Sequence, residues 1–155
     1  MKFGITVSQI KEIELAVRAE QRGYDFCWVW DSPMIRSNVW ATLALIADRT
    51  KRIALGPGVA VPALSMAPVT ANAIATISAI APGRTFLGLG TGNTALRAMG
   101  QKPMSIKAFD NHLKLIKGLL EGTTVDFEAN GLSEAISFQS LELEHINICL
   151  LYTSP

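Results

Sequence analysis

Residues 52–89 read RIALGPGVAVPALSMAPVTANAIATISAIAPGRTFLGL, and this stretch decides the fold class. Its first part, from Arg52 to Ala60, is short and apolar and predicts a β-strand. Pro68 then suits the first turn of a helix that ends before Pro82-Gly83, and residues 85–89 predict the next strand. Parallel strands cannot be joined by a tight hairpin and need a crossover connection. The stretch therefore predicts a strand, a crossover helix and a second, parallel strand.

The same cycle recurs on both sides of this stretch. Before it, residues 2–7 and 24–30 predict strands, residues 9–22 predict an amphipathic helix, and Asn38 is placed to cap a helix that runs to Thr50. After it, a loop over residues 90–104 leads to a helix that begins at Ser105 and ends at Gly122. Four consecutive strand-helix units indicate an α/β fold with parallel strands. Because a closed barrel needs about 250 residues, the units form either an open sheet or the N-terminal half of a TIM (β/α)8 barrel.

The pattern changes after Gly122. Residues 125–128 and 136–143 predict short extended segments around the turn signal Asn130-Gly131, and no fifth crossover helix is predicted.

The composition excludes several classes of protein. Hydrophobic residues make up 49% of the chain and charged residues 17%, which argues against intrinsic disorder. With 14 Lys and Arg against 13 Asp and Glu, the chain has no excess of cations for a nucleic-acid backbone. The longest apolar stretch, residues 66–81, contains polar residues and is short for a membrane span. We therefore expect no nucleic-acid partner and no membrane.

Neither the cysteines nor the histidines form a metal pattern. Cys27 and Cys149 are far apart and fit no disulfide framework, so a reducing cytoplasm is the expected location. His112 and His145 have no ligand partner at metal-binding spacing, and no metal site is predicted.

The end of the second predicted strand carries the leading functional residue, Asp31. Side chains alternate along a strand, so Phe26, Trp28 and Trp30 share one face, and Asp31 shares the other with Cys27 and Val29. In a barrel, the aromatic face is expected to pack under the helices, and Asp31 to stand at the carboxyl end of the strand, where barrel active sites form. A turn or helix-capping aspartate before Pro33 is the alternative.

Glycines mark the ends of the next two strands, at Gly56 and Gly58 and at Gly88, Gly90 and Gly92. Bare backbone on neighbouring strands suggests room for a flat ligand, and close packing of helix on sheet is the alternative. Residues 90–95 also fit a loose dinucleotide pattern, but no long helix follows the glycines directly and no acidic residue ends a following strand. Arg36 and Arg97 follow the second and fourth strands and could meet an anionic ligand.

At these strand ends the chain resembles the bacterial luciferase-like superfamily of flavin- or F420-dependent oxidoreductases, in particular the branch of methylenetetrahydromethanopterin reductase. The resemblance covers residues 1–122. The matching segments are Lys2-Phe3-Gly4-Ile5, Gly23-Tyr24-Asp25, Trp30-Asp31, residues 52–59, Pro62, Ala67-Pro68, Pro82-Gly83-Arg84 and residues 87–92.

The resemblance implies a TIM barrel with the cofactor, F420 or FMN, at the carboxyl ends of the strands. It implies hydride transfer, or oxygen activation on reduced flavin, with a small-molecule substrate and a homo-oligomeric full-length protein. It also implies a non-prolyl cis peptide at Gly58-Val59 behind the cofactor ring. Asp31 would contact the polar edge of the ring or the substrate, and Thr91, Gly92 and Asn93 would bind the cofactor. Asn93 replaces a carboxylate that some relatives use as a proton donor, so the proton donor is unassigned.

Two expectations concern the extent and class of the chain. Residues 1–148 are expected to be part of a barrel domain, and residues 149–155, which match nothing in the family, to be a non-native tail. On that basis the isolated chain is expected to be an inactive fragment that associates and binds flavin poorly. The alternative function is a non-catalytic α/β module in which Asp31 and Arg97 hold a small polar ligand.

Overall fold

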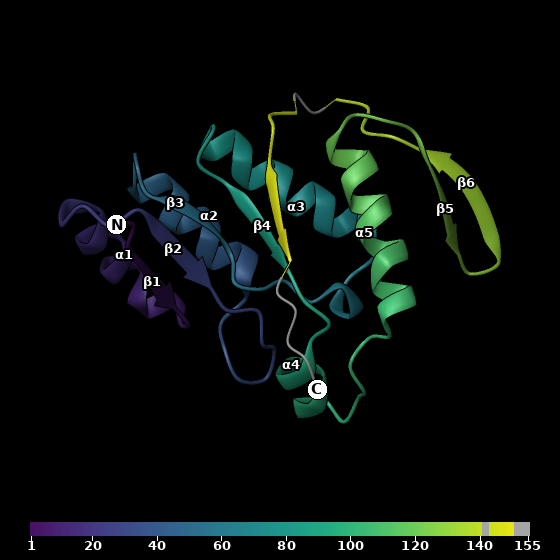
Figure 1. The fold of residues 1–155 in the computed structure, drawn as a ribbon, viewed down its shortest axis with the longest axis horizontal. Helices are drawn as coiled ribbons and strands as arrows, with labels where there is room; N and C mark the ends of the chain where they lie inside the picture. The colour runs from purple at the N-terminus through teal and green to yellow at the C-terminus, as the bar shows by residue number, and fades with distance from the viewer. Residues whose placement is uncertain (141–142, 151–155) are drawn as a thin grey trace.

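The computed structural model describes residues 1–140 and 143–150 and contains one curved layer of parallel strands (Figure 1). Strands β1 (Gly4–Val7), β2 (Phe26–Val29) and β3 (Ala54–Pro57) form a parallel sheet in that order. Strands β4 (Phe86–Leu89) and β7 (Asn147–Leu150) form a second parallel pair. Hydrogen bonds from Leu55 N to Arg84 O (2.9 Å) and from Ala60 N to Gly88 O (2.8 Å) join β3 to β4. The α/β class with parallel strand-helix units is confirmed, and the described strands do not close into a barrel.

The main helices are α1 (Ile13–Gln21), α2 (Val39–Arg49), α3 (Ala67–Ile80) and α5 (Ile106–Leu120); in Figure 1, α2 and α3 lie behind the strands and α5 lies to the right of β7. The predicted cap at Asn38 is present, because its side chain accepts a hydrogen bond from Ala41 N; the Ser105 hydroxyl also caps α5 by accepting one from Ala108 N. Short 3₁₀ turns at Ile10–Glu12 (η1) and Pro62–Leu64 (η2) precede α1 and α3. The prediction of an uninterrupted loop over residues 90–104 is wrong, since α4 (Asn93–Ala98) lies within it.

The hydrophobic core lies between the strands and these helices. In β2, Cys27 and Val29 are 0% and 1% exposed and pack into this core, whereas Phe26 and Trp28 are only half-buried. The prediction that the aromatic face packs under the helices is therefore wrong. The small side chains face the helices because close helix-sheet packing favours them, and the large rings stack on each other at 5.5 Å on the opposite face.

The segment after α5 also differs from the prediction. Strands β5 (Val125–Ala129) and β6 (Leu132–Ile136) form a hairpin, with positive φ angles at Asn130 (54°) and Gly131 (76°). The extended segment placed at residues 136–143 thus begins and ends earlier. β7 then pairs in parallel with β4, a partner that the sequence did not predict, and includes Cys149 and Leu150. Residues 151–155, the rest of the expected non-native tail, lie outside the described residues.

The amino ends of the strands are held by two charged side chains. Glu20 Oε1 accepts hydrogen bonds from the backbone N–H groups of Lys51 (2.8 Å), Arg52 (2.6 Å) and Ile53 (3.0 Å). The Arg84 guanidinium donates to carbonyl oxygens at the end of α2 and the start of β3, namely those of Ala47, Thr50 and Ile53, and to the Thr50 hydroxyl. The segment Pro82-Gly83-Arg84 therefore has a structural role at the end of the strands opposite Asp31.

Candidate active site

A pocket of about 240 Å³ lies at the carboxyl ends of β2, β3 and β4. It contains all of the sequence-predicted site residues: Asp31, Gly58, Val59, Thr91, Gly92 and Asn93. The remaining lining residues are Trp30, Ser32, Val61, Gly90, Thr94 and Ala95. Because carboxyl ends of parallel strands meet at one edge, segments far apart in the sequence converge there.

The Gly58-Val59 peptide bond is cis, as the family resemblance implied. Gly58 N donates to Val29 O (2.8 Å), and Ala60 N donates to Gly88 O (2.8 Å), so the backbone is anchored to both neighbouring strands. Gly58 and Val59 line the pocket between β2 and β4.

The glycines of β3 and β4 have a different cause from the one proposed from the sequence. A Cβ atom on Gly56 would lie 2.0 Å from Phe86 O, and one on Gly88 would lie 2.4 Å from Pro57 O. Both distances are far below a normal contact, so these glycines allow the two strands to approach each other. Contact between the strands accounts for glycine at positions 56 and 88, and this close packing is between strands rather than between helix and sheet.

Gly92 combines a positive φ angle of 84° with close packing, since its Cβ would lie 2.2 Å from Val61 Cγ1. It precedes α4 directly, so Asn93 is the first residue of that helix. Gly92 thereby brings α4 against the segment that follows β3.

The Asp31 carboxylate is fixed at the pocket wall. Its Oδ2 atom accepts a hydrogen bond from Val61 N (3.1 Å). Burial raises the pKa of the Asp31 carboxyl above its usual range, and the hydrogen bond from Val61 acts in the opposite direction. Asp31 caps no helix, because Asn38 fills that position at α2. Of the two readings of Asp31, the structure therefore favours a side chain held in the pocket.

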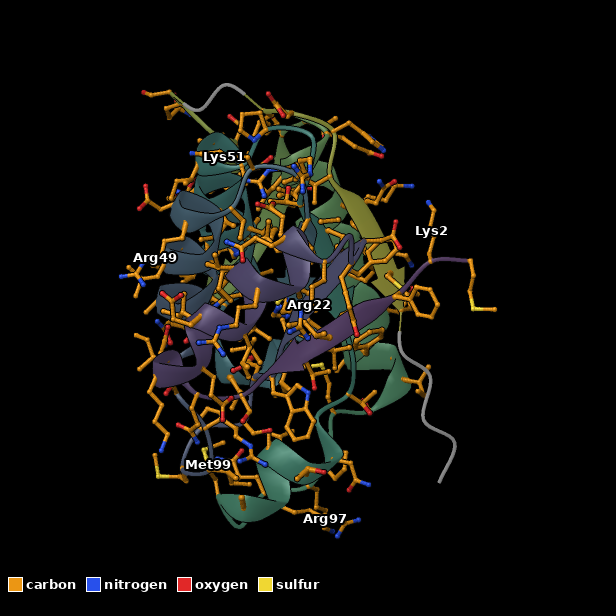
Figure 2. The ribbon with its side chains drawn as sticks, turned by 90° about the vertical axis from the view of Figure 1, so that its left-hand side faces the viewer. Lys2, Arg22, Arg49, Lys51, Arg97 and Met99 are labelled. Carbon is orange, nitrogen blue, oxygen red and sulfur yellow. The ribbon has the colours of Figure 1, made fainter. Side chains whose placement is uncertain are left out.

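The two arginines flagged from the sequence do not line the pocket. The Arg36 guanidinium lies 4.9 Å from the centre of the Trp30 ring and stacks on it. Arg97 donates from Nε to Asn93 Oδ1 and is exposed. Figure 2 shows Arg97 at the outer end of α4, with its side chain directed away from the strands.

Three pocket residues were missed from the sequence: Trp30, Ser32 and Val61. Trp30 was assigned to a face beneath helices, but it lines the pocket beside Asp31. Val61 gave no sequence signal, because its role is played by its backbone N–H and by its contact with Gly92. Only the fold brings it to Asp31.

The chemistry of this lining suits a flat, partly polar organic ring. Trp30, Val59 and Val61 offer apolar surface, while Thr91, Asn93 and Asp31 offer a hydroxyl, an amide and a carboxylate. The described part of the chain has no cluster of three or more His, Cys, Asp or Glu side chains that could hold a metal ion. Cys27 is not a candidate nucleophile, because burial raises the pKa of its thiol to about 12.

Comparison with known proteins identifies the family. The family model described as luciferase-like monooxygenase matches residues 7–141. The chain belongs to this family. The family resemblance that the strand-end motifs suggested is thereby confirmed.

Among curated relatives, a 5,10-methylenetetrahydromethanopterin reductase of Archaeoglobus fulgidus is 38% identical over 136 residues, which cover 83% of this chain and 40% of the relative. An F420-dependent glucose-6-phosphate dehydrogenase of Mycolicibacterium fortuitum is 36% identical over 131 residues, covering 75% of this chain and 39% of the relative.

Among solved structures, the oxygenating constituent of 3,6-diketocamphane monooxygenase of Pseudomonas putida, in complex with FMN, aligns with a TM-score of 0.71 and 21% identity. That alignment covers 92% of this chain and 45% of the other, and it supports the fold alone. The chain thus spans less than half the length of these relatives. None of the helices in the described part of the chain has the length and apolar character needed to cross a lipid bilayer.

Proposed function

We propose that this chain forms the cofactor-facing part of an F420-dependent oxidoreductase, with hydride transfer between cofactor and a small organic substrate. The observation that carries the proposal is the pocket itself, which joins an apolar surface at Val59 to hydrogen-bonding groups at Thr91 and Asn93 and one carboxylate at Asp31. The curated relatives support F420 over FMN, since the dehydrogenase named above is F420-dependent and is 36% identical to this chain.

The cofactor would supply the redox chemistry, accepting or donating a hydride. The chain would hold the cofactor and the substrate in position. The backbone at Gly58 and Val59 would lie beneath the ring, and Thr91, Gly92 and Asn93 would hydrogen-bond its polar edge. Asp31 would contact the substrate or the ring. Apolar contacts from Trp30 and Val59 would exclude water from the reacting atoms.

Arg36 would affect the cofactor indirectly, through its contact with Trp30. Its guanidinium lies 4.9 Å from the centre of the Trp30 ring, and this contact would hold the indole in place beside the pocket. Arg36 is therefore proposed as a positioning residue for Trp30, not as an anion-binding residue.

The alternative of a binding module without chemistry has less support. It requires Asp31 and Arg97 to hold one ligand together, but Arg97 is absent from the pocket lining and bonds Asn93 instead.

The proposal is tested by cofactor titration of the full-length gene product that carries this chain. F420 is expected to bind with a micromolar Kd, measured from its absorbance and fluorescence, and to be reduced or oxidised by a substrate under anaerobic conditions. Tight binding of FMN with oxygen consumption would identify the monooxygenase form instead. Binding of neither cofactor would refute the proposal.

A substitution at Asp31 separates function from folding. Asp31→Asn keeps the shape of the side chain and an acceptor for Val61 N, but it removes the negative charge. Loss of one acid–base or electrostatic group is expected to lower turnover by about 100-fold or more. The free energy of unfolding should hold or rise slightly, because burial disfavours the charge. Asp48→Asn, at an exposed position of α2, is the matched control, and equal turnover in the two variants would contradict the role of Asp31.

A further inference from the structure

A second cavity lies directly behind Asp31. It has a volume of about 250 Å³, is open to solvent, and lies between the β2–α2 loop and the segment around η2. Asp31 and Val61 line both this rear cavity and the candidate active-site pocket in front. The hydrogen-bonded pair of Asp31 and Val61 is therefore the partition between the two spaces.

The rear cavity has the polar groups that bound water requires. Besides Asp31, Asn38, Ser65 and Thr70 line it. Asn38 Oδ1 already accepts a hydrogen bond from Ala41 N (3.0 Å), but its amide retains two donors that can bond water. A water molecule needs two to four polar partners and about 30 Å³ of liquid volume. The rear cavity meets both conditions.

Asp31 is the single titratable side chain among the described residues that line either cavity. The cations on neighbouring segments are engaged elsewhere: Arg36, on its own loop, stacks on Trp30, and Arg97, on α4, bonds Asn93. Within the described residues, no hydrogen bond holds Asp31 Oδ1, so this oxygen can exchange a proton. Burial also raises the proton affinity of the carboxyl, seen as its elevated pKa.

We propose that Asp31 is the proton-transfer residue of the reaction and that the rear cavity is its water-filled route to solvent. This inference rests on the proposed function. It fills the role for which Asn93 is unsuited, since a neutral amide releases no proton.

The substrate of this step has a reacting carbon that bears a hydrogen and a hydroxyl. The electron pair and hydrogen of the C–H bond leave as hydride to the oxidised cofactor, the carbon–oxygen double bond forms, and the hydroxyl proton passes to the Asp31 carboxylate. Asp31 then gives this proton to water in the rear cavity while the front pocket is filled. Reduction of a carbonyl substrate runs through the same groups in reverse.

The test fills the rear cavity without touching the front pocket. Ser65→Leu places an apolar side chain in the rear cavity, and Ala79→Leu adds the same side chain to an exposed position of α3 as the matched control. Ser65→Leu is expected to lower turnover by about threefold to tenfold and to increase the solvent deuterium isotope effect, with an unchanged cofactor Kd. In cofactor-free protein, it should raise the pKa of the Asp31 carboxyl, measured by ¹³C NMR, because it removes water from one side of that group.

Chemical rescue is an independent test of the role of Asp31. Asp31→Gly should lose about 100-fold or more in turnover, and added formate should restore at least tenfold of it by supplying a small carboxylate. Adding Ser65→Leu to Asp31→Gly should abolish this rescue, because formate would lose its route from behind.

The outcomes separate a failure of the proposed function from a failure of the proton route. If neither F420 nor FMN binds the wild-type protein, the proposed function fails and this inference fails with it. If a cofactor binds and turns over, but Ser65→Leu matches Ala79→Leu in isotope effect and in the pKa of Asp31, the proposed function stands and the proton route is refuted.

Discussion

Gly92 and Gly100 form a matched pair that tests how the pocket is built. Both have positive φ angles, 84° and 73° respectively. A Cβ on Gly92 would lie 2.2 Å from Val61 Cγ1, whereas a Cβ on Gly100 would have nothing within 4 Å. Alanine at either position thus meets the same backbone cost, and only Gly92→Ala adds a clash.

The expected magnitudes follow from these two terms. The left-handed conformation costs a non-glycine residue about 1–2 kcal/mol, offset by about 0.4–1 kcal/mol from the lower entropy of the unfolded chain. Gly100→Ala should therefore destabilise by about 1 kcal/mol or less. Overpacking adds about 1–3 kcal/mol, so Gly92→Ala should lower the free energy of unfolding by about 2 kcal/mol more than Gly100→Ala.

The clash should also reach the functional site, because Val61 N holds the Asp31 carboxylate. Cofactor affinity is expected to fall in Gly92→Ala and to hold in Gly100→Ala. Urea unfolding with an unchanged m-value measures the first effect, and cofactor titration measures the second. Equal stabilities for the two variants would refute the claim that contact with Val61 requires glycine at position 92.

Two further predictions concern the opposite end of the strands. Arg84→Ala removes a charged donor from carbonyl oxygens at the end of α2 and should lower the free energy of unfolding by about 3 kcal/mol. The control Arg49→Ala breaks an exposed ion pair with Glu14 and should lower it by less than about 1 kcal/mol. Similar urea midpoints for the two variants would contradict the role of Arg84. Burial acts to raise the pKa of Glu20, but three backbone hydrogen bonds outweigh it and hold the pKa below its usual range. A carboxyl whose pKa is lower in the folded state stabilises the fold above the unfolded pKa, and this contribution is lost as the pH falls through the folded pKa. The stability difference between wild type and Glu20→Gln should therefore be constant above about pH 5 and shrink below about pH 4. A stability difference independent of pH from about 7 to 3 would contradict the lowered pKa of Glu20.

Local sequence patterns were sufficient for the order of strands and helices from β1 to β4. The crossover stretch at residues 52–89 predicted β3, α3 and β4, because apolar runs bounded by proline and glycine reflect local backbone preferences. The helix cap at Asn38 and the helix start at Ser105 were predicted for the same reason, since a capping side chain bonds the backbone only a few residues away.

Alternation along β2 shows where local reasoning failed. The sequence correctly separated Phe26 and Trp28 from Cys27 and Val29, but it assigned the aromatic pair to the wrong side. Alternation fixes which side chains share a face, and it carries no information about which face the helices cover. That choice depends on packing between segments distant in the sequence.

Short motifs at the strand ends were enough to predict the parallel α/β class, the family and six of the residues that line the pocket. Three features became visible in the folded chain alone: the strand contacts at Gly56 and Gly88, the pairing of β7 with β4, and the hydrogen bond by which Val61 holds Asp31 between two cavities. Each of these depends on the distance between atoms of segments far apart along the chain, and no local preference of the backbone specifies that distance.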